Sequence, residues 1–327
     1  MNYQKSEKIL KEINSAKNIL VNCHLSPDAD SVGCALSMFQ ILKKIGKKVK
    51  VVSPSNVTDN LKFLPYFGEI QKINFKKFNF NNYDLFLVLD TPSPDYLTGS
   101  KKTPLPKIPI IVIDHHQTNP KFGKVNLIDR NISSAAELLF LVLEDWNIKL
   151  DKNIATTILA GIIGDTNVFR YPSVTVQTLN ISRSLMQLGA DKNEIIFNIF
   201  SSVDINRIKF WGEILAGFKM EKDKKFAWTA VPYEIYEKYN SPESGRESAS
   251  SNFGQIIEGT DFSIFMTEEQ KNILSVGLRS RKNFDVSKIA HDLGGGGHKA
   301  AAGVKIEGVE FEEAVEKVLK VARKYAK

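Results

Sequence analysis

The stretch Ile108–Asn119, "IPIIVIDHHQTN", places an aspartate and two adjacent histidines directly after a short run of β-branched apolar residues. The run Ile110–Ile113 is typical of a buried strand, because a proline precedes it and polar residues follow it. Successive side chains of an extended segment point in opposite directions. We therefore expect His115 and His116 to have two different roles unless the chain turns between them.

The same near-continuous apolar pattern recurs through the first 200 residues. It predicts strands over 18–23, 48–52, 85–89 and 110–113, and helices over 133–146, 153–166 and 174–189. Strands without polar alternation are covered on both faces, which favours a mostly parallel sheet flanked by helices. The fold class predicted for this part is α/β. Ser133 or Ser134 could cap the first of these helices, with Glu137 at capping-box distance.

A chain of 327 residues suits two domains. We expect residues 1–200 to form the first, a helical connector to span 201–219, and a smaller α/β domain to occupy 220–327. The second domain has strand patterns at 226–231, 261–266 and 273–278, followed by a glycine run and an amphipathic helix from residue 309. The stretch 240–252, "NSPESGRESASSN", is predicted to be a surface loop.

Composition narrows the class of protein. The 44 basic and 37 acidic residues give a net charge of +7, which suits either solubility or an anionic, phosphate-bearing partner. Cys23 and Cys34 are too few for a zinc finger and are expected to fill core space. The N-terminus looks like a charged helix rather than a signal peptide, and no apolar run approaches about 20 residues. We expect a cytoplasmic protein that does not bind membranes.

Acidic residues and histidines follow several of the predicted strands and helices. His24, Asp28 and Asp30 come after the first strand, Asp90 after the third, and Asp165 after an apolar helical segment. Each aspartate alone is also typical of a helix cap or a turn. However, open parallel sheets place ligand sites at the carboxyl ends of their strands, and carboxylates held close together repel unless a cation or a proton separates them. The sequence therefore favours a bound metal.

The type and number of these groups predict more than one ion. Imidazoles with carboxylates suit Mn²⁺, Fe or Zn better than Ca²⁺. Three strand ends and one helix end together supply six such groups, which is more than one catalytic metal normally takes. We therefore expect two divalent ions bridged by a shared carboxylate. The ions should lie about 3.5–4 Å apart, as in two-metal phosphoryl hydrolases. Mn²⁺ is the metal that we expect.

Five motifs carry a resemblance to a known family. "HLSPDADSVG" (24–33), "LDT" (89–91), "IDHHQTNP" (113–120) and "GDTNVF" (164–169) occur in the order of the DHH phosphoesterase motifs. "GGGGHKAAAG" (294–303), with "LRSR" (278–281) upstream, resembles the associated DHHA1 domain. The chain is similar to the nano-RNase and pAp-phosphatase branch of this RecJ-like superfamily. It differs from the family at Cys34, where serine is common, and at Asn167, where glycine is common.

The resemblance implies a role for each motif residue. One metal would be bound by His24, Asp28 and Asp90, and a second by Asp30, Asp90, His115 and Asp165, with Asp90 as the bridge. His116 would face the scissile phosphate as an electrophile or acid, and Asp114 would orient the histidine pair. A purely structural pair of buried histidines is the alternative.

The glycine run is predicted to bind substrate. Gly294–Gly297 let the backbone approach an anion closely, and Arg279 offers a forked pair of donors for a terminal phosphate. The alternative is a flexible loop. The predicted substrate-binding residues are Arg279, Ser280, Gly295, Gly296, Gly297 and His298, with Arg281 as a weaker candidate.

The resemblance implies a metal-dependent phosphoesterase that hydrolyses short oligoribonucleotides to 5′-mononucleotides, 3′-phosphoadenosine 5′-phosphate to AMP, or both. Rival enzymes are a soluble cyclic or linear dinucleotide phosphodiesterase and a RecJ-like single-strand exonuclease; "GGGGH" counts against an inorganic pyrophosphatase. A nucleotide- or RNA-binding protein with an inactive site is the rival from another class. The sequence leaves open the cleavage polarity, the choice of RNA over DNA and the oligomeric state, with a homodimer among the options.

Overall fold

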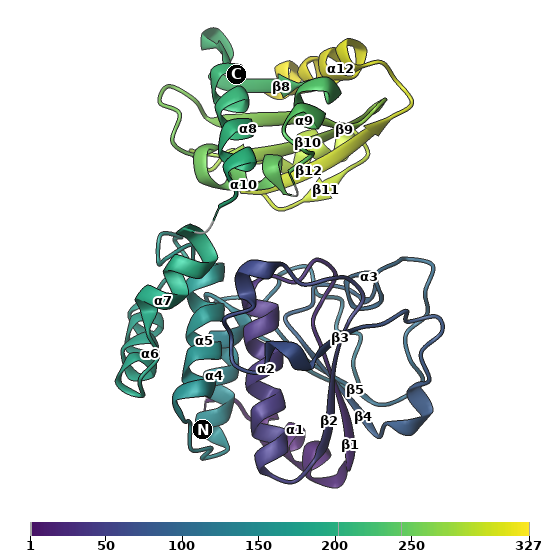
Figure 1. Cartoon of the computed structure of the whole chain (residues 1–327), viewed down its shortest axis with the longest axis vertical. Helices are drawn as coiled ribbons and strands as arrows, with labels where there is room; N and C mark the ends of the chain where they lie inside the picture. The colour runs from purple at the N-terminus through teal and green to yellow at the C-terminus, as the bar shows by residue number, and fades with distance from the viewer. Residues whose placement is uncertain (1, 202, 243, 327) are drawn as a thin grey trace. The chain divides into compact units, whose positions relative to one another are not determined.

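The computed structural model describes residues 2–201, 203–242 and 244–326. The chain divides into two compact units, Met1–Ser202 and Val203–Lys327 (Figure 1). Each unit has a six-stranded sheet and a hydrophobic core of its own. None of the described helices is both long and apolar enough to cross a membrane.

The first unit is built on a parallel sheet with the strand order β3-β2-β1-β4-β5-β6. Its strands are β1 (Asn18–Asn22), β2 (Lys48–Ser53), β3 (Ile70–Lys72), β4 (Leu85–Leu89), β5 (Ile110–Asp114) and β6 (Val125–Ile128). From the central pair β1 and β4 the chain builds outward in opposite directions. The carboxyl ends of β1 and β4 therefore flank a topological switch point, where open α/β sheets bind their ligands.

Helices and loops cover the two faces of this sheet. The helices are α1 (Lys5–Ser15), α2 (Ala29–Lys44), α3 (Pro94–Thr98), α4 (Ala135–Asp145), α5 (Lys152–Asp165), α6 (Val176–Gln187) and α7 (Lys192–Ile196). One face packs with α2, α4 and α5 in the main core. The other face carries a smaller core around Leu20, Phe86 and Val88, to which the segments 73–83 and 97–108 contribute. Burial of both faces explains the continuous apolar pattern and confirms the α/β class.

Two glycines let the helices of the main core approach closely. A Cβ on Gly33 of α2 would lie 2.4 Å from the carbonyl oxygen of Thr157 in α5. A Cβ on Gly161 of α5 would lie 2.6 Å from the Cβ of Ala136 in α4. The three helices therefore converge at the start of α2, beside the carboxyl ends of the strands.

The second unit has a mixed sheet in the order β11-β12-β10-β9-β8-β7. Its strands are β7 (Lys219–Glu221), β8 (Phe226–Val231), β9 (Phe262–Gln270), β10 (Ile273–Ser280), β11 (Gly296–Gly297) and β12 (Ala301–Glu307). Its helices are α8 (Ile205–Ala216), α9 (Tyr233–Lys238), α10 (Gly245–Phe253), α11 (Ser287–Asp292) and α12 (Phe311–Tyr325). α11 and α12 pack on one face, and α8 and α10 on the other. Among the described strands of this sheet, β8 and β9 pair in parallel and the other neighbours are antiparallel.

Short helical turns complete both units. They are η1 (Asp59–Leu61), η2 (Phe67–Glu69), η3 (Phe80–Asn82), the π-helical η4 (Phe197–Ser201) and η5 (Lys222–Lys224).

The structure differs from two expectations about the second unit. The predicted connector 201–219 contains α8, whose Phe210 and Ile214 are buried in the core of the second unit. The predicted surface loop 240–252 contains most of α10, where Ala249 and Ser250 are buried. Serine and glycine favour helices weakly, so packing on the sheet decides this segment rather than local propensity. Residues 202 and 243 lie outside the described residues.

Candidate metal centre

The loop after β1 brings the first two predicted ligands to the carboxyl end of the sheet. His24 donates a hydrogen bond from Nδ1 to the backbone carbonyl of Leu25 at 2.9 Å, which leaves Nε2 facing Asp90 Oδ2 at 3.5 Å. Asp28 caps α2, since its Oδ1 accepts the N–H groups of Asp30 and Ser31 at 3.0 Å each. The same Oδ1 lies 3.8 Å from His24 Nε2, so Asp28 is both a cap and a neighbour of the histidine.

Asp30 is buried and held by the first turn of α4. Its Oδ2 accepts the N–H of Ala135 at 2.7 Å and its Oδ1 the N–H of Ala136 at 2.9 Å. Cys34, one turn further along α2, is also buried, with its Sγ 3.6 Å from Asp30 Oδ1. Burial, together with the charges of Asp90 and Asp165, raises the pKa of Asp30 well above its ordinary value.

Asp90 lies at the centre of the cluster. It follows β4 directly, has a left-handed backbone with φ 46°, and is 2% exposed. Its Oδ1 is 3.5 Å from His115 Nε2 and 3.6 Å from His116 Nδ1, yet it has no hydrogen-bond partner among the described residues. Burial raises the pKa of Asp90, but the neighbouring His115 and His24 lower it by more. The pKa of Asp90 therefore lies far below its ordinary value.

The two adjacent histidines both lie near Asp90, but each also has a neighbour of its own. Their rings lie 4.7 Å apart at 63°. His115 Nε2 is 3.5 Å from Asp165 Oδ2, at the end of α5, as well as 3.5 Å from Asp90. His116 Nδ1 instead makes a 2.8 Å hydrogen bond with Asp114 Oδ1. The two rings therefore occupy distinct positions, and the two different roles expected from the sequence stay a prediction.

Asn119 completes the environment of Asp114, and sequence reasoning did not identify it. Its Nδ2 donates to Asp114 Oδ2 at 2.6 Å and to the carbonyl of Thr91 at 2.9 Å. Asn119 thus ties the loop after β5 to the loop after β4. The one feature of the sequence that could have indicated Asn119 is its position three residues after the histidine pair.

The carboxylates of the cluster lie close together, and their charges shift the pKa values of its members. Burial and the charges of Asp90 and Asp28 raise the pKa of Asp165 to about 7, although His115 opposes the shift. Burial lowers the pKa of His24, but Asp90 and Asp28 outweigh it and raise that pKa to about 9. The cluster therefore holds protons at neutral pH in positions where bound cations could replace them.

The donor set fits metal ions. Three groups have ligand atoms within 4.8 Å of one another: His24, Asp28 and Asp90; Asp30, His115 and Asp165; and Asp90, His115 and His116. The imidazole–carboxylate distances of 3.5–3.8 Å exceed those of ordinary hydrogen bonds. Two ligand atoms about 2.1 Å from a shared ion lie roughly 3–3.5 Å apart, which is close to these distances. The orphaned Asp90 Oδ1 is likewise suited to a cation.

Asn167, which differs from the resembled family, lies just beyond Asp165. It has φ 47°, the left-handed region that glycine adopts freely and asparagine tolerates better than most residues. The substitution therefore keeps the local backbone without supplying a proposed ligand.

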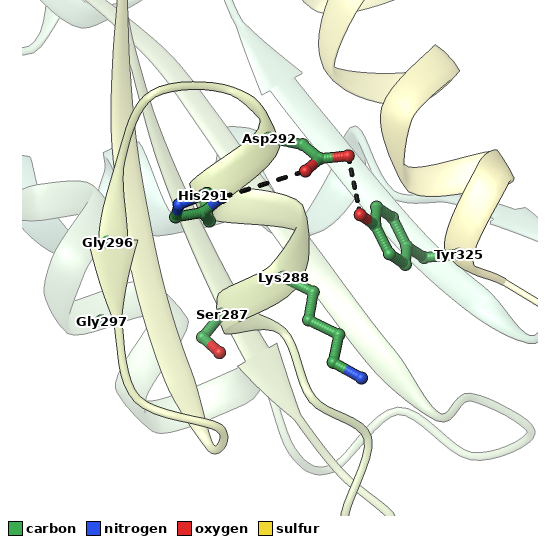
Figure 2. A pocket seen from close by; sticks show the side chains of 7 residues that line it. All are labelled: Ser287, Lys288, His291, Asp292, Gly296, Gly297 and Tyr325. Atoms are coloured by element: carbon green, nitrogen blue, oxygen red, sulfur yellow. Dashed lines mark hydrogen bonds and ion pairs between the residues drawn. The ribbon is translucent and has the colours of Figure 1, made fainter.

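In the second unit, two of the predicted glycines line a pocket of about 350 Å³ (Figure 2). Its lining residues are Ser287, Lys288, His291, Asp292, Gly296, Gly297 and Tyr325. Figure 2 shows the Asp292 carboxylate between His291 and Tyr325, and the Tyr325 hydroxyl donates to Asp292 Oδ2 at 2.7 Å. Sequence reasoning missed Lys288, His291 and Tyr325, which come from two helices without a recognisable motif.

Of the other predicted substrate-binding residues, Arg279 and Ser280 end β10, and His298 lies in the turn before the neighbouring strand β12. β10 pairs Arg279 with Ala301 of β12, and the N–H of His298 donates to the carbonyl of Ala301 at 2.7 Å. Arg279 donates from Nη2 to Ser251 Oγ at 3.3 Å.

Of these positions, Ser280 is buried and Gly295 has a packing role. Ser280 is 6% exposed and its Oγ has no hydrogen-bond partner among the described residues. A Cβ on Gly295 would lie 2.3 Å from the carbonyl oxygen of Gly303, so glycine there permits the close approach to β12.

The chain matches two family models. The DHH family, N-terminal domain, matches residues 18–162, and the DHHA1 domain matches residues 245–327. The first match contains five of the six predicted metal ligands, and the second contains the glycine run.

Similar proteins extend the likeness over nearly the whole chain. The bifunctional oligoribonuclease and PAP phosphatase NrnA of Thermus thermophilus is 28% identical over 325 residues, which are 97% of this chain and 92% of that protein. The cyclic-di-AMP phosphodiesterase GdpP of Bacillus subtilis is 28% identical over 329 residues, 94% of this chain and 48% of that protein. The crystal structure of an exopolyphosphatase-related protein from Bacteroides fragilis superimposes with a TM-score of 0.89 at 27% identity, covering 98% of this chain and 95% of that one. The chain thus carries a domain of the DHH family over residues 18–162, followed by a DHHA1 domain over residues 245–327.

Proposed function

We propose that this protein is a two-metal phosphoesterase that hydrolyses short oligoribonucleotides to 5′-mononucleotides and removes the 3′-phosphate of 3′-phosphoadenosine 5′-phosphate. The observation that carries the proposal is the convergence of two carboxylate–histidine groups on Asp90. The similarity to an oligoribonuclease and PAP phosphatase across 92% of that relative supports the choice of substrates.

The metal-holding residues follow from the grouping of donors. We propose that His24, Asp28 and Asp90 hold one ion, and that Asp30, His115 and Asp165 hold the other, with Asp90 shared. When bound, two such ions supply Lewis acidity toward phosphoryl oxygens and lower the pKa of water. The mixed imidazole–carboxylate donor set favours Mn²⁺ over Ca²⁺ or Mg²⁺.

His116 is the proposed proton donor. Its Nδ1 bonds to Asp114, so Nε2 is the atom available to the leaving oxygen of the substrate. Burial lowers the pKa of His116, but Asp114 and Asp90 more than offset that effect and raise it above its ordinary value. The shift favours the protonated ring, which is the form that a general acid uses.

The second unit is proposed to bind the substrate. Arg279 offers a fork of donors to a phosphate, and the backbone at Gly296 and Gly297 lines a pocket beside Lys288. His298, in the turn between β11 and β12, is proposed to contact the same substrate.

We further propose that the protein acts in the cytoplasm with Mn²⁺ as its native metal. Both cysteines are buried free thiols, in keeping with a reducing compartment.

A cyclic or linear dinucleotide phosphodiesterase is the second candidate. The similarity to GdpP, which covers 94% of this chain, favours it.

One assay separates these functions. The purified chain is incubated with Mn²⁺ or with chelator, and product release is followed from five substrates: RNA of two to five nucleotides, a long single strand, 3′-phosphoadenosine 5′-phosphate, cyclic di-AMP and pyrophosphate. We expect Mn²⁺-dependent turnover of the short RNA and of the bisphosphate.

The control variants define the site. Asp90→Ala should abolish turnover and metal retention, whereas Asp59→Ala, at an exposed aspartate that pairs with Lys62, should change neither. Turnover of cyclic di-AMP alone would select the second candidate, and binding without turnover would select a nucleotide-binding protein.

A further inference from the structure

Tyr96 is an exposed aromatic residue beside the candidate metal centre. It lies in α3, in the stretch "DTPSPDYLTG" (90–99) that begins with Asp90. Its ring centroid is 6.2 Å from that of His24, and the two rings meet edge to face at 72°. Tyr96 is 44% exposed, while the next residue, Leu97, is fully buried. The side chain thus stands out of the protein at the rim of the cluster.

The backbone fixes the position of this ring. The N–H of Leu25, next to His24, donates to the carbonyl of Tyr96 at 2.8 Å. At the end of α3, Gly99 has φ +79°, and a Cβ there would lie 2.9 Å from Cβ of Pro54. Because α3 is tied to the loop after β1 and packed against the loop after β2, Tyr96 and His24 keep a fixed relation.

The hydroxyl group of Tyr96 has no hydrogen-bond partner among the described residues. A partly exposed aromatic ring next to a candidate metal centre is suited to stacking on part of a substrate. Every nucleobase has a π face, so stacking on an aromatic side chain can hold any base. In a nucleotide, one sugar separates the base from the phosphate. The distance that this sugar spans is similar to the 6.2 Å between the ring centroids of His24 and Tyr96.

We propose that Tyr96 is a specificity-determining residue that stacks against the nucleobase adjoining the scissile phosphate. The substrate class selected in this way is a nucleotide or oligonucleotide rather than a bare sugar phosphate. This inference rests on the proposed function, because it takes the phosphate to be bound at His24 and Asp90.

The test compares substrates with and without a base. The full chain with Mn²⁺, and its variants Tyr96→Ala and Tyr96→Phe, are assayed on 3′-phosphoadenosine 5′-phosphate and on ribose 3,5-bisphosphate. We expect Tyr96→Ala to lower kcat/KM for the adenosine compound about tenfold, mainly through KM, and to leave the base-free compound within twofold. Tyr96→Phe should behave like the original protein, because the ring and not the hydroxyl carries the effect.

A matched control and a metal measurement complete the design. Tyr66→Ala removes another half-exposed tyrosine, whose ring packs 5.7 Å from Phe39, and should affect both substrates equally. Equal losses on both substrates in Tyr96→Ala, or loss of bound Mn²⁺ by elemental analysis, would mean that Tyr96 only supports His24 and would overturn the inference. If the original protein hydrolyses neither compound, the proposed function itself fails, which is a separate result.

Discussion

The buried carboxylate of Asp30 accepts the first two N–H groups of α4, at 2.7 Å from Ala135 and 2.9 Å from Ala136. These amides belong to the first turn of a helix, whose free N–H groups and dipole favour negative charge. α4 therefore orients a predicted metal ligand that belongs to a different helix, α2. Any displacement of α4 or α5 relative to α2 should reach the metal centre through Asp30.

Gly161→Ala should disturb this arrangement. The new Cβ would lie 2.7 Å from Asp30 Oδ1 and 2.6 Å from the Cβ of Ala136. We expect the free energy of unfolding, measured in urea, to fall by about 1–3 kcal/mol, with a weaker affinity for Mn²⁺. Gly212→Ala is the control, because a Cβ there has nothing within 4 Å on an exposed helix position. That variant should be as stable as the original or up to about 1 kcal/mol more stable. An unchanged Mn²⁺ affinity in Gly161→Ala would show that Asp30 does not depend on this packing.

Asp114→Asn should slow catalysis while keeping the metals. The substitution removes the charge behind His116 but leaves an oxygen that can still meet its Nδ1. Loss of such a supporting partner typically costs 10–100-fold in activity. We expect kcat to fall in this range on 3′-phosphoadenosine 5′-phosphate at saturating Mn²⁺, with the metal content unchanged. A parallel loss of metal would assign Asp114 to metal binding instead.

The affinity for Mn²⁺ should rise between pH 6 and pH 8. Asp165 has a pKa of about 7 and His24 of about 9, so metal binding must displace protons that the metal-free fold holds. Calorimetric titration at several pH values measures the effect. In Asp165→Asn one of these protons is absent, so the dependence of the remaining affinity on pH should be shallower.

The metal-free protein should show the opposite trend in stability. Both groups bind a proton more tightly folded than unfolded, so the folded state carries more protons between about pH 6 and pH 9. The free energy of unfolding should therefore increase as the pH falls through this window: the part from His24 is lost as the pH rises through about 9, and the part from Asp165 as it rises through about 7. Urea unfolding of chelator-treated protein at pH 6, 7, 8 and 9 checks the sign. Greater stability at pH 9 than at pH 6 would contradict it.

His298→Ala should weaken substrate binding without affecting the metals. The side chain belongs to the turn between β11 and β12 in the second unit, and the predicted ligands belong to the first. We expect KM for short RNA to rise about tenfold while kcat and the Mn²⁺ content stay near those of the original protein. A fall in kcat alone would instead give His298 a role in the chemical step.

Much of the fold was predictable because its main strands are buried on both faces. The strand predicted over 85–89 matches β4, and those at 18–23, 48–52 and 110–113 match β1, β2 and β5 within one residue at each end. The edge strands β3 and β6 were not identified, because they are short and the outer side chains of β3 are polar or exposed. α10 was missed since its sequence favours a loop, and only its packing on the second sheet makes it helical.

The candidate site was predictable as far as side chains reveal chemistry. The six metal ligands could be predicted because their carboxylates and imidazoles follow predicted strands and helices in the sequence. The amides of Ala135 and Ala136 could not be identified, because backbone donors are the same in every residue and only the fold directs them at Asp30. Tyr96 looked like any other aromatic residue until the structure showed it beside His24.

Asp90 sits at a backbone position with φ 46°, which disfavours residues that carry a Cβ by roughly 1–2 kcal/mol. Glycine would relieve that strain, and asparagine would reduce it, but glycine would remove the carboxylate and asparagine its charge. Selection for thermal stability therefore favours replacing Asp90, whereas selection for turnover favours keeping it. A library of this protein screened only for heat resistance should accumulate inactive chains altered at position 90.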